Sequence, residues 1–436
     1  MSADLRRTGA QAAIARLTAS VLAVKPLVEG LAAPIRVVPA ARQEGGPPTA
    51  WSADQHGVLR GVLERVAHQA GVRGLTPAAD LSYDDLQVFE RVVSHRLTLA
   101  DAAGFLGDAR GGIPQETDRI AAEAVADGFD AVFRKEVLLS SDGVPLNVYG
   151  SRRGGETVVL VPACGMPAAL AEGWMRFLAR DHRVVTWESR GLFGAGGRHG
   201  DYDVGVDAQA ADLFSVLDHY GVARAHVVGL CGGAVIALAA ASARPERIAS
   251  LSLWHGAYEF VDGCPKTRHH QDLVELMAFA SRSRAAALSV QHTICQMALA
   301  DTPADVAHFV LYPFVNAEVF YRYCRVNGSL ATTDVGQYLR RVTQPVLLVT
   351  SEDDETAHPQ SSVLVADGLP NARLRVEPHG DHISLFGADD ALMRVASDFI
   401  AEQSAEHPAG PLTDPPGTGP LSRTEDSDRP RPEERP

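Results

Sequence analysis

The chain has 436 residues and a formal net charge of −14 at pH 7. At about 150 residues per domain, this length predicts two or three domains. Hydrophobic residues make up 46% of the chain, which supports a sizeable core and excludes global disorder. A net anion repels phosphate, so the charge balance disfavours nucleic acid as a partner. The five cysteines form no CxxC pair, which argues against a disulfide framework or a zinc site.

Residues 1–133 are predicted to form an N-terminal helical region. Apolar residues recur at helical spacing in GVLRGVLERVAHQAG from Gly57 and in DDLQVFERVVSHR from Asp84. A Gly- and Pro-rich break at 41–50 separates these stretches from an earlier short helix. The first residues lack the sustained apolar core of a signal peptide, and no apolar run of about 18 residues predicts a membrane span. A cytoplasmic location is therefore expected.

Two alternative interpretations of this region are less well supported. The segments LTLADAAGFLG and PQETDRIAAEAVADG are ordered as in a helix-turn-helix, but the second is dominated by acidic side chains and would repel phosphate. The segment DLSYDDLQVFERV is similar to a carrier-protein helix, but Asp85 stands where the phosphopantetheine serine would be. A docking or dimerisation region is the favoured interpretation, and the oligomeric state stays open.

The pattern changes near residue 134. Two short strands around Asp142-Gly143 predict a hairpin, and apolar strands then alternate with helices. This alternation is typical of a mostly parallel α/β sheet with helices on both faces. Residues from about 260 to 342 interrupt this alternation with a helical stretch rich in aromatic residues, which we interpret as an inserted cap. The aromatic side chains of the cap either pack in its core or line an acyl pocket. Residues 403–436 are rich in proline, glycine and charge and are predicted to be a disordered tail.

The candidate nucleophile is Cys231, in the sequence Gly229-Leu230-Cys231-Gly232-Gly233. The segment follows the strand AHVVGL and opens the helix GGAVIALAAA, as in the G-x-S-x-G nucleophile elbow with cysteine in place of serine. The turn is so tight that glycines are needed on both sides. The helix N-terminus favours a thiolate, and its first amide can bind an oxyanion. The alternative, a Gly-rich turn around a buried cysteine, is disfavoured by this placement between strand and helix.

Candidates for the acid and the base follow two later strands. Asp354 follows the strand QPVLLVT and His382 follows the strand ARLRVEP, which is the nucleophile–acid–base order of such sites. Asp354 is preferred to Asp353 because it lies three residues after Ser351, which takes the glycine position of a G-x-x-D turn. His382 is preferred to His379, which we interpret as a solvated loop residue.

The loop after the first long strand should supply further oxyanion amides. Gly165 and Met166 are the predicted donors there, with the amide of Gly232 as their partner. Cys164 in the same loop is interpreted as a small hydrophobe, and the three cysteines near the cap are expected to pack.

Other polar residues near these loops have weaker signals. Glu188-Ser189-Arg190-Gly191 follows the strand HRVVTW, where Asp-x-Arg-Gly commonly provides an ion pair and a turn that fix the loop. His255, His269 and His270 are expected to be solvated or to face substrate.

Residues 134–402, about three fifths of the chain, resemble an α/β-hydrolase in strand order, elbow, acid loop, histidine loop and Glu-Ser-Arg-Gly. With Cys231 as nucleophile, the chain is similar to the cysteine-dependent members: Dieckmann cyclases that release tetramates or pyridones from polyketide–peptide assembly lines, cysteine thioesterases and dienelactone hydrolases. Assembly-line members often place the acid after the strand that follows the nucleophile helix. Here that strand ends in Trp254-His255-Gly256, and Asp262 is the reserve candidate for the acid.

These residues predict an acyl-transfer enzyme with a Cys-His-Asp triad. Thioester exchange is nearly neutral in free energy, and an acyl-cysteine reacts well with carbon and nitrogen nucleophiles. The expected substrate is a thioester-activated small-molecule acyl group, free or bound to a carrier protein, in a thioesterase, cyclase or acyltransferase of specialised metabolism such as antibiotic biosynthesis. The alternatives are a cysteine-dependent ester or lactone hydrolase and a non-catalytic scaffold. No cofactor, metal, nucleic acid or membrane is expected as a partner.

Overall fold

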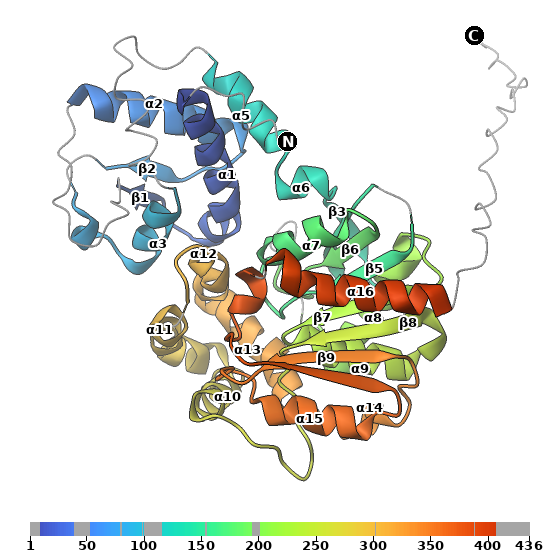
Figure 1. Ribbon diagram of the computed structural model, residues 1–436. Coiled ribbons are helices and arrows are strands. Elements are labelled where there is room, and N and C mark those ends of the chain that lie inside the picture. Colours follow the sequence, from blue (N-terminus) through green and yellow to red (C-terminus); the bar gives the residue numbers. More distant parts are fainter. Residues whose placement is uncertain are drawn as a thin grey trace, which may run out of the picture.

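The computed structural model describes residues 9–38, 53–78, 81–97, 99, 116–152, 155–193, 201–300, 302–387 and 389–406. Three parts are visible in Figure 1: an N-terminal region, a central sheet with its helices, and a helical cap. In the sequence the cap is inserted between two strands of that sheet. The tail was predicted from residue 403, but the last helix continues to Glu406 and the rest of the tail lies outside the described residues.

The N-terminal region is built around one long helix. Its helices are α1 (Gly9–Gly30), α2 (Ala53–Gln69), α3 (Val88–Leu97), α5 (Thr117–Ala126) and α6 (Phe129–Val132). The region also contains a two-stranded parallel sheet of β1 (Ile35–Val37) and β2 (Leu75–Pro77). The sequence did not predict these strands because three residues are too short to show an alternating pattern. The first helix of the helix-turn-helix alternative lies outside the described residues.

Helix α1 is long and apolar enough to cross a membrane by length and composition alone, which the sequence analysis did not foresee. In the structure it packs against α2, α3 and α5, and Leu17, Val21 and Val24 are fully buried in this contact. Packing in a protein core therefore accounts for its apolar face.

The central sheet has eight strands in the order β10-β9-β8-β7-β5-β6-β4-β3. The predicted hairpin is present, with β3 and β4 antiparallel around the turn at Gly143, and β4 is also antiparallel to β6. All other neighbouring pairs are parallel. The strands are β3 (Glu136–Leu139), β4 (Pro145–Gly150), β5 (Thr157–Val161), β6 (Arg183–Trp187), β7 (Ala225–Leu230), β8 (Ile248–Trp254), β9 (Val346–Ser351) and β10 (Ala372–Glu377).

Helices cover both faces of this sheet, as predicted. On one face, α7 and α16 pack with Trp174 and Trp254 in a shared apolar cluster (Figure 1). On the other face, α8, α9 and α15 pack, and α9 lies close to the strands because most of its buried residues are small, with half of them alanine. The bounds are α7 (Glu172–Leu178), α8 (Val206–His219), α9 (Gly233–Ala243), α15 (Pro359–Gly368) and α16 (Asp390–Glu406). The predicted α/β class is confirmed.

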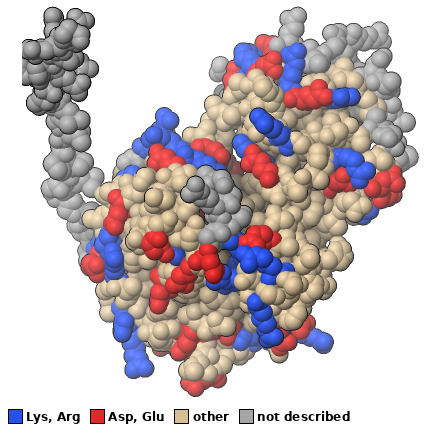
Figure 2. Space-filling view, turned by 180° about the vertical axis from the view of Figure 1, so that it is seen from behind, with Lys and Arg blue, Asp and Glu red and all other residues tan. Residues whose placement is uncertain are grey.

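The cap lies between β8 and β9 and also contacts the N-terminal region. Helix α12 packs against α1 and α3, and Asn316 Nδ2 donates a hydrogen bond to Gly30 O at 3.2 Å. The apolar core runs without interruption from α1 through the cap to the sheet. Figure 2 shows acidic and basic side chains intermixed on the face seen there. The cap helices are α10 (Arg268–Ala280), α11 (Arg284–Ala300), α12 (Ala307–Val310), α13 (Ala317–Ala331) and α14 (Gly336–Leu339).

Candidate active site

Cys231 occupies a strained turn between β7 and α9. Its φ of +55° is unusual for a residue with a side chain. A Cβ on Gly233 would lie 2.3 Å from the carbonyl oxygen of Val161, and a Cβ on Gly229 would lie 2.8 Å from the backbone of Ala234. The two glycines therefore let the turn pack against its neighbours, and the turn places Cys231 on the cavity wall at the carboxyl end of the sheet.

His382 lies within hydrogen-bond distance of this thiol. It comes from the loop after β10, and its Nε2 is 2.9 Å from Cys231 Sγ. Burial opposes ionisation of Cys231, but the charge and hydrogen bond of His382 and the amide of Gly232 lower the pKa of the thiol overall. Burial likewise lowers the pKa of His382, but the charges of Cys231 and Asp354 raise it well above its usual value. Both shifts favour a thiolate beside an imidazolium over the neutral pair.

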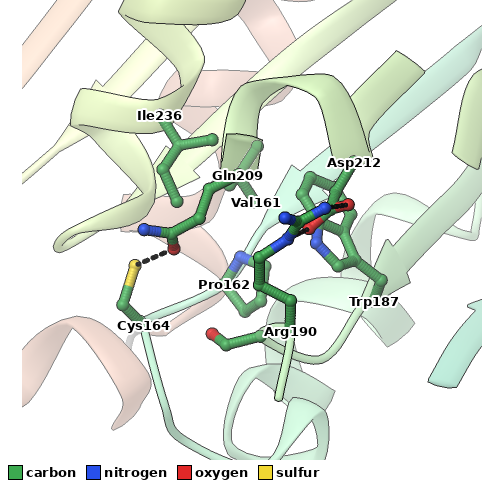
Figure 3. Close-up of a pocket in the computed structure, with 9 residues that line it drawn as sticks. Val161, Pro162, Cys164, Trp187, Arg190, Gln209, Asp212 and Ile236 are labelled. Carbon is green, nitrogen blue, oxygen red and sulfur yellow. Dashed lines mark hydrogen bonds and ion pairs between the residues drawn. The ribbon is translucent and has the colours of Figure 1, made fainter. Parts of the chain in front are cut away.

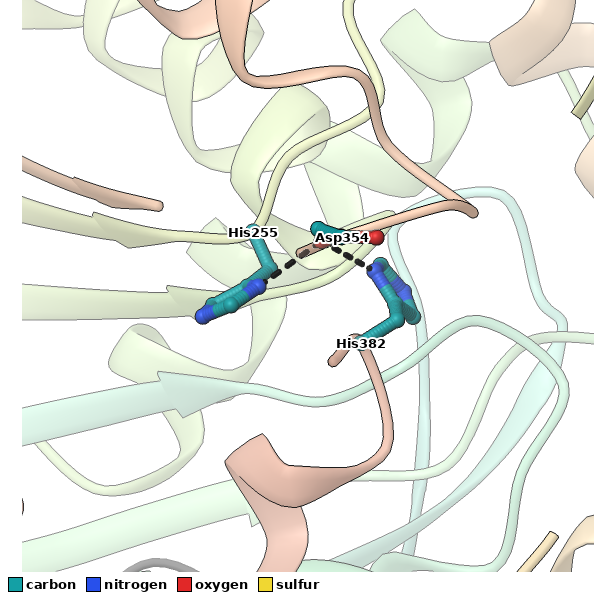
Figure 4. A group of neighbouring side chains, drawn as sticks. All are labelled: His255, Asp354 and His382. Atoms are coloured by element: carbon teal, nitrogen blue, oxygen red, sulfur yellow. Dashed lines mark hydrogen bonds and ion pairs between the residues drawn. The ribbon is translucent and has the colours of Figure 1, made fainter. Parts of the chain in front are cut away.

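Asp354 orients this base and is held by four hydrogen bonds. Its Oδ2 is 3.1 Å from His382 Nδ1 and 2.8 Å from His255 Nδ1 (Figure 4). Its Oδ1 accepts the amides of Thr356 at 2.9 Å and Ala357 at 2.8 Å. Burial opposes the charge, but the His382 charge and these hydrogen bonds keep the pKa of the carboxyl well below its usual value.

The position of His255 differs from the sequence-based expectation. It was expected to be solvated or to face substrate, but it is buried, has a φ of +49°, and holds Asp354 from the end of β8. This is the strand end at which assembly-line enzymes often carry the acid. The only signal in the sequence was this position directly after a strand, because the contact joins residues 99 apart in the chain.

The alternative acid and base residues lie outside this group. His379 and Asp353 pair with each other at 3.2 Å, and both are largely exposed. Asp262 is exposed at the start of the cap, and among the described residues no hydrogen bond joins it to His382. The structure thus brings Cys231 and His382 together with Asp354.

The predicted oxyanion donors need a correction. The amide of Gly165 already donates to Ser189 Oγ at 2.8 Å, and the amide of Met166 donates to Ala163 O at 3.2 Å. Neither N–H is free for an oxyanion. Ala163 lines the same cavity as Cys231 and Gly232, and its own N–H has no acceptor in the part of the chain that the structure describes.

Glu188 and Ser189 hold this loop in place. Glu188 Oε1 accepts the amide of Ala168 at 3.2 Å, and Oε2 accepts Asn147 Nδ2 at 2.8 Å. Together with the Ser189–Gly165 bond, these contacts attach both ends of the loop to the strand end of β6. The loop-fixing role predicted for this segment therefore rests on hydrogen bonds.

Arg190 forms its ion pairs elsewhere than expected. Its guanidinium, which is almost fully buried, is bidentate to Asp212 at 2.7 and 2.8 Å and also binds Asp142 at 2.8 Å, with no ion pair to Glu188 among the described contacts. Figure 3 shows Arg190 and Asp212 beside Cys164, whose Sγ is 3.9 Å from Gln209 Oε1, around a small cavity of about 10 Å³. The ion pairs join the hairpin turn to helix α8 and leave little space for a ligand.

Cys231 and His382 open into a larger cavity of about 210 Å³ between the sheet and the cap. Of the cap aromatics, Phe314 and Tyr323 border it, and the Tyr323 ring lies directly over Gly165. The others, Phe309, Tyr312, Phe320 and Tyr321, are not part of its wall. Most of the remaining wall is apolar and includes Leu273, Val274, Met277, Ile294, Met297 and Leu330. The cavity can enclose an acyl chain next to the thiol.

Comparisons with known proteins support the fold. A family model described as the alpha/beta hydrolase fold matches residues 156–266. A Caulobacter segnis protein named "Putative carbamate hydrolase RutD" is 30% identical over 257 residues, which cover 55% of this chain and 90% of that protein. The protein of the same name from Stutzerimonas stutzeri is 24% identical, covering 57% and 93%.

Solved structures show the same fold. A hydrolase from Pseudomonas aeruginosa is 21% identical with a TM-score of 0.50, covering 61% of this chain and 98% of that one. An enol-lactonase from Burkholderia xenovorans is 18% identical with a TM-score of 0.50, covering 61% and 100%. The aligned share corresponds in size to the sheet domain with its cap.

Proposed function

The chain belongs to the α/β-hydrolase family of enzymes, and from this premise we propose that it transfers acyl groups through Cys231, with His382 as acid and base and Asp354 as the orienting carboxylate. The observation that supports this most directly is the 2.9 Å distance between Cys231 Sγ and His382 Nε2, at an elbow with a φ of +55°. The lowered pKa of Cys231 favours the thiolate, which is the form that attacks.

The proposed first step is a thioester exchange. The Cys231 thiolate attacks the acyl carbon, and the carbonyl oxygen receives the negative charge near the amides of Gly232 and Ala163. The bond between the acyl carbon and the leaving sulfur then breaks. His382 gives its proton to the departing thiolate and becomes neutral. The products are an acyl-Cys231 and a free thiol, so atoms and charge balance.

In the second step an acceptor amine, hydroxyl or carbon acid attacks the acyl-cysteine. His382 takes the proton that the acceptor loses, the bond to Cys231 Sγ breaks, and the thiolate–imidazolium pair forms again. The apolar cap wall limits the water around the intermediate. Transfer or cyclisation, in a thioesterase-like, cyclase-like or acyltransferase reaction of specialised metabolism, is therefore favoured over simple hydrolysis. The acyl donor is a small molecule or a carrier-bound thioester in the cytoplasm.

Hydrolysis is the second candidate. It is supported by the names of the curated relatives, which refer to carbamate hydrolysis, and the same residues would serve an ester, lactone or carbamate if water were the acceptor. The two candidates share the acyl-Cys231 intermediate and differ only in what attacks it.

The test is to incubate the protein with acyl-N-acetylcysteamine thioesters, with and without an added amine, and to analyse peptides by mass spectrometry. We expect the acyl mass on the Cys231 peptide and an amide product that exceeds the free acid. Free acid in excess at every amine concentration would favour hydrolysis instead.

The matched control is Cys264→Ala, which removes a partly exposed thiol that lies at the edge of the cap and does not line the cavity. It should leave the labelling of Cys231 intact. Labelling of other cysteines but not of Cys231 would refute the proposed nucleophile.

A further inference from the structure

Two side chains on the wall of the large, mostly apolar cavity each have a buried polar atom with no partner among the described residues. Glu259 and His270 both border the cavity that contains Cys231 and His382. They come from the segment that enters the cap and from the first turn of α10, where Thr267 Oγ1 accepts the amide of His270 at 3.0 Å. We call Glu259 and His270 the polar wall.

His270 is 7% exposed, and its Nδ1 is buried with no hydrogen-bond partner in the described part of the chain. Burial, and then the charges of Lys266 and His382, lower its pKa to about 4. The ring is therefore neutral at pH 7 and able both to donate and to accept a hydrogen bond. A buried polar group without a partner is destabilising, so the arrangement favours a compensating contact.

Glu259 presents a second such group. Its Oε2 is 2.6 Å from Lys266 Nζ, so the charge of the carboxylate is already balanced. Its Oε1 is buried and has no partner among the described residues. An oxygen of this kind accepts a hydrogen bond, and because the charge is balanced it does not require a cation.

We propose that the polar wall binds an uncharged hydrogen-bond donor, an amide N–H or a hydroxyl, carried on the chain of the acyl substrate. The inference rests on the proposed function because it names the acyl class that the Cys231 site would accept. The apolar helices α10, α11 and α13 hold the hydrocarbon part, and Glu259 with His270 selects chains that carry the donor. A plain fatty acyl chain would leave both groups unpaired, which is how a hydrogen-bonding site rejects an analogue that lacks the group.

Binding to the Cys231→Ala protein tests this without any chemistry. The ligands are acyl amides of one chain length in three series: unsubstituted, with a hydroxyl at successive positions, and with a secondary amide at successive positions. Calorimetric titration should give a Kd at least about tenfold lower for one substituted ligand than for the plain chain. Whether that ligand belongs to the hydroxyl series or to the amide series shows which of the two donors the polar wall binds.

The same titration is repeated after His270→Leu and Glu259→Gln, each added to Cys231→Ala. The ratio of the two Kd values should fall toward one in both variants. It should stay about tenfold in the control His292→Leu, which changes an exposed histidine of α11 that does not line the cavity. Two variants are used so that the test survives if one of them fails to fold.

A plain chain that binds as tightly as every substituted one, a ratio that persists in both variants, or no binding in any series would overturn the polar wall. Absence of acyl-Cys231 in the labelling experiment would instead refute the proposed function. The two failures are distinguishable because the titration uses a protein without the thiol.

Discussion

The loop ends of the sheet and the cap differ in whether the buried polar groups compared below have hydrogen-bond partners. At the loop ends, Asp354 accepts four hydrogen bonds and His382 is held at both ring nitrogens. In the cap, His270, His308 and Glu259 each have a buried polar atom with no partner among the described residues. Satisfied networks rigidify a site, whereas unsatisfied groups are costly unless a ligand or a rearrangement pairs them. From this difference we propose that the sheet supplies a preorganised reaction centre and the cap supplies selectivity.

The largest effect should come from removing the reaction centre itself. We expect Cys231→Ala to lower turnover of an acyl-thioester surrogate by about 10³-fold or more, because the variant lacks the thiol that would form the acyl intermediate. The measurement is steady-state release of thiol, with circular dichroism to show that the fold persists. Near-normal turnover in this variant would remove the basis for contrasting a reaction centre with a cap.

Asp354→Asn should be next, with a loss of kcat/KM of about 10²–10⁴-fold. The amide no longer fixes the His382 tautomer. Activity requires the thiolate and the imidazolium together, so it rises with pH as Cys231 loses its proton and falls as His382 loses its own. Since the Asp354 charge raises the pKa of His382, its removal should move the alkaline limb to lower pH.

The neighbouring change Asp353→Asn is the matched control for that experiment. Asp353 is exposed and pairs only with the exposed His379 among the described contacts. Activity and the pH profile should both stay close to those of the unaltered protein. An equal loss in both variants would mean that general surface charge, rather than the triad, controls the rate.

Gly165→Ala tests where the cap contacts the catalytic loop. The new Cβ would lie 2.5 Å from Tyr323 Cδ2, at a residue whose φ is +79°. We expect a loss of about 1–3 kcal/mol in the free energy of unfolding and about a tenfold loss of activity as the loop shifts. Gly143→Ala has a similar φ of +81° but open space around it, so it should show the backbone strain alone. Equal losses in both would show that the contact with Tyr323 is unimportant.

The change with the smallest expected effect at neutral pH is at His308, and it concerns folding stability rather than activity. His308 lies where α12 meets α3 and is almost fully buried. Burial, with the charge of Arg96, lowers its pKa to about 3 from an ordinary value of 6.5. The unfolded chain therefore binds a proton that the folded chain does not. Stability from this group is complete above pH 6.5 and falls by about 1.4 kcal/mol per pH unit as the pH drops toward 3.

Denaturant unfolding at successive pH values checks this. Between pH 6 and pH 4, His308→Leu should reduce the slope of the unfolding free energy against pH by an amount that corresponds to up to about one bound proton. The control His292→Leu, at an exposed histidine, should leave this slope unchanged. An unchanged slope in His308→Leu would mean that the ring finds a partner in solution.

The sequence alone determined the parts that depend on local pattern. Alternation of apolar strands and helices predicted the sheet, and the glycines around Cys231, with Asp354 and His382 at later strand ends, predicted which side chains would meet. These signals are readable because strand period, tight turns and the convergence of parallel strand ends are short-range or topological rules.

The tertiary structure decided the rest. The support of Asp354 by His255, the bonding of Arg190 to Asp212 and Asp142, and the engaged amide of Gly165 each depend on which distant segments come within 3 Å of one another. The packing of the N-terminal region on the cap likewise depends on contacts between residues that are far apart in the sequence. Such contacts leave no periodic trace in a single sequence, because a hydrogen bond between distant residues constrains only one or two positions at each end.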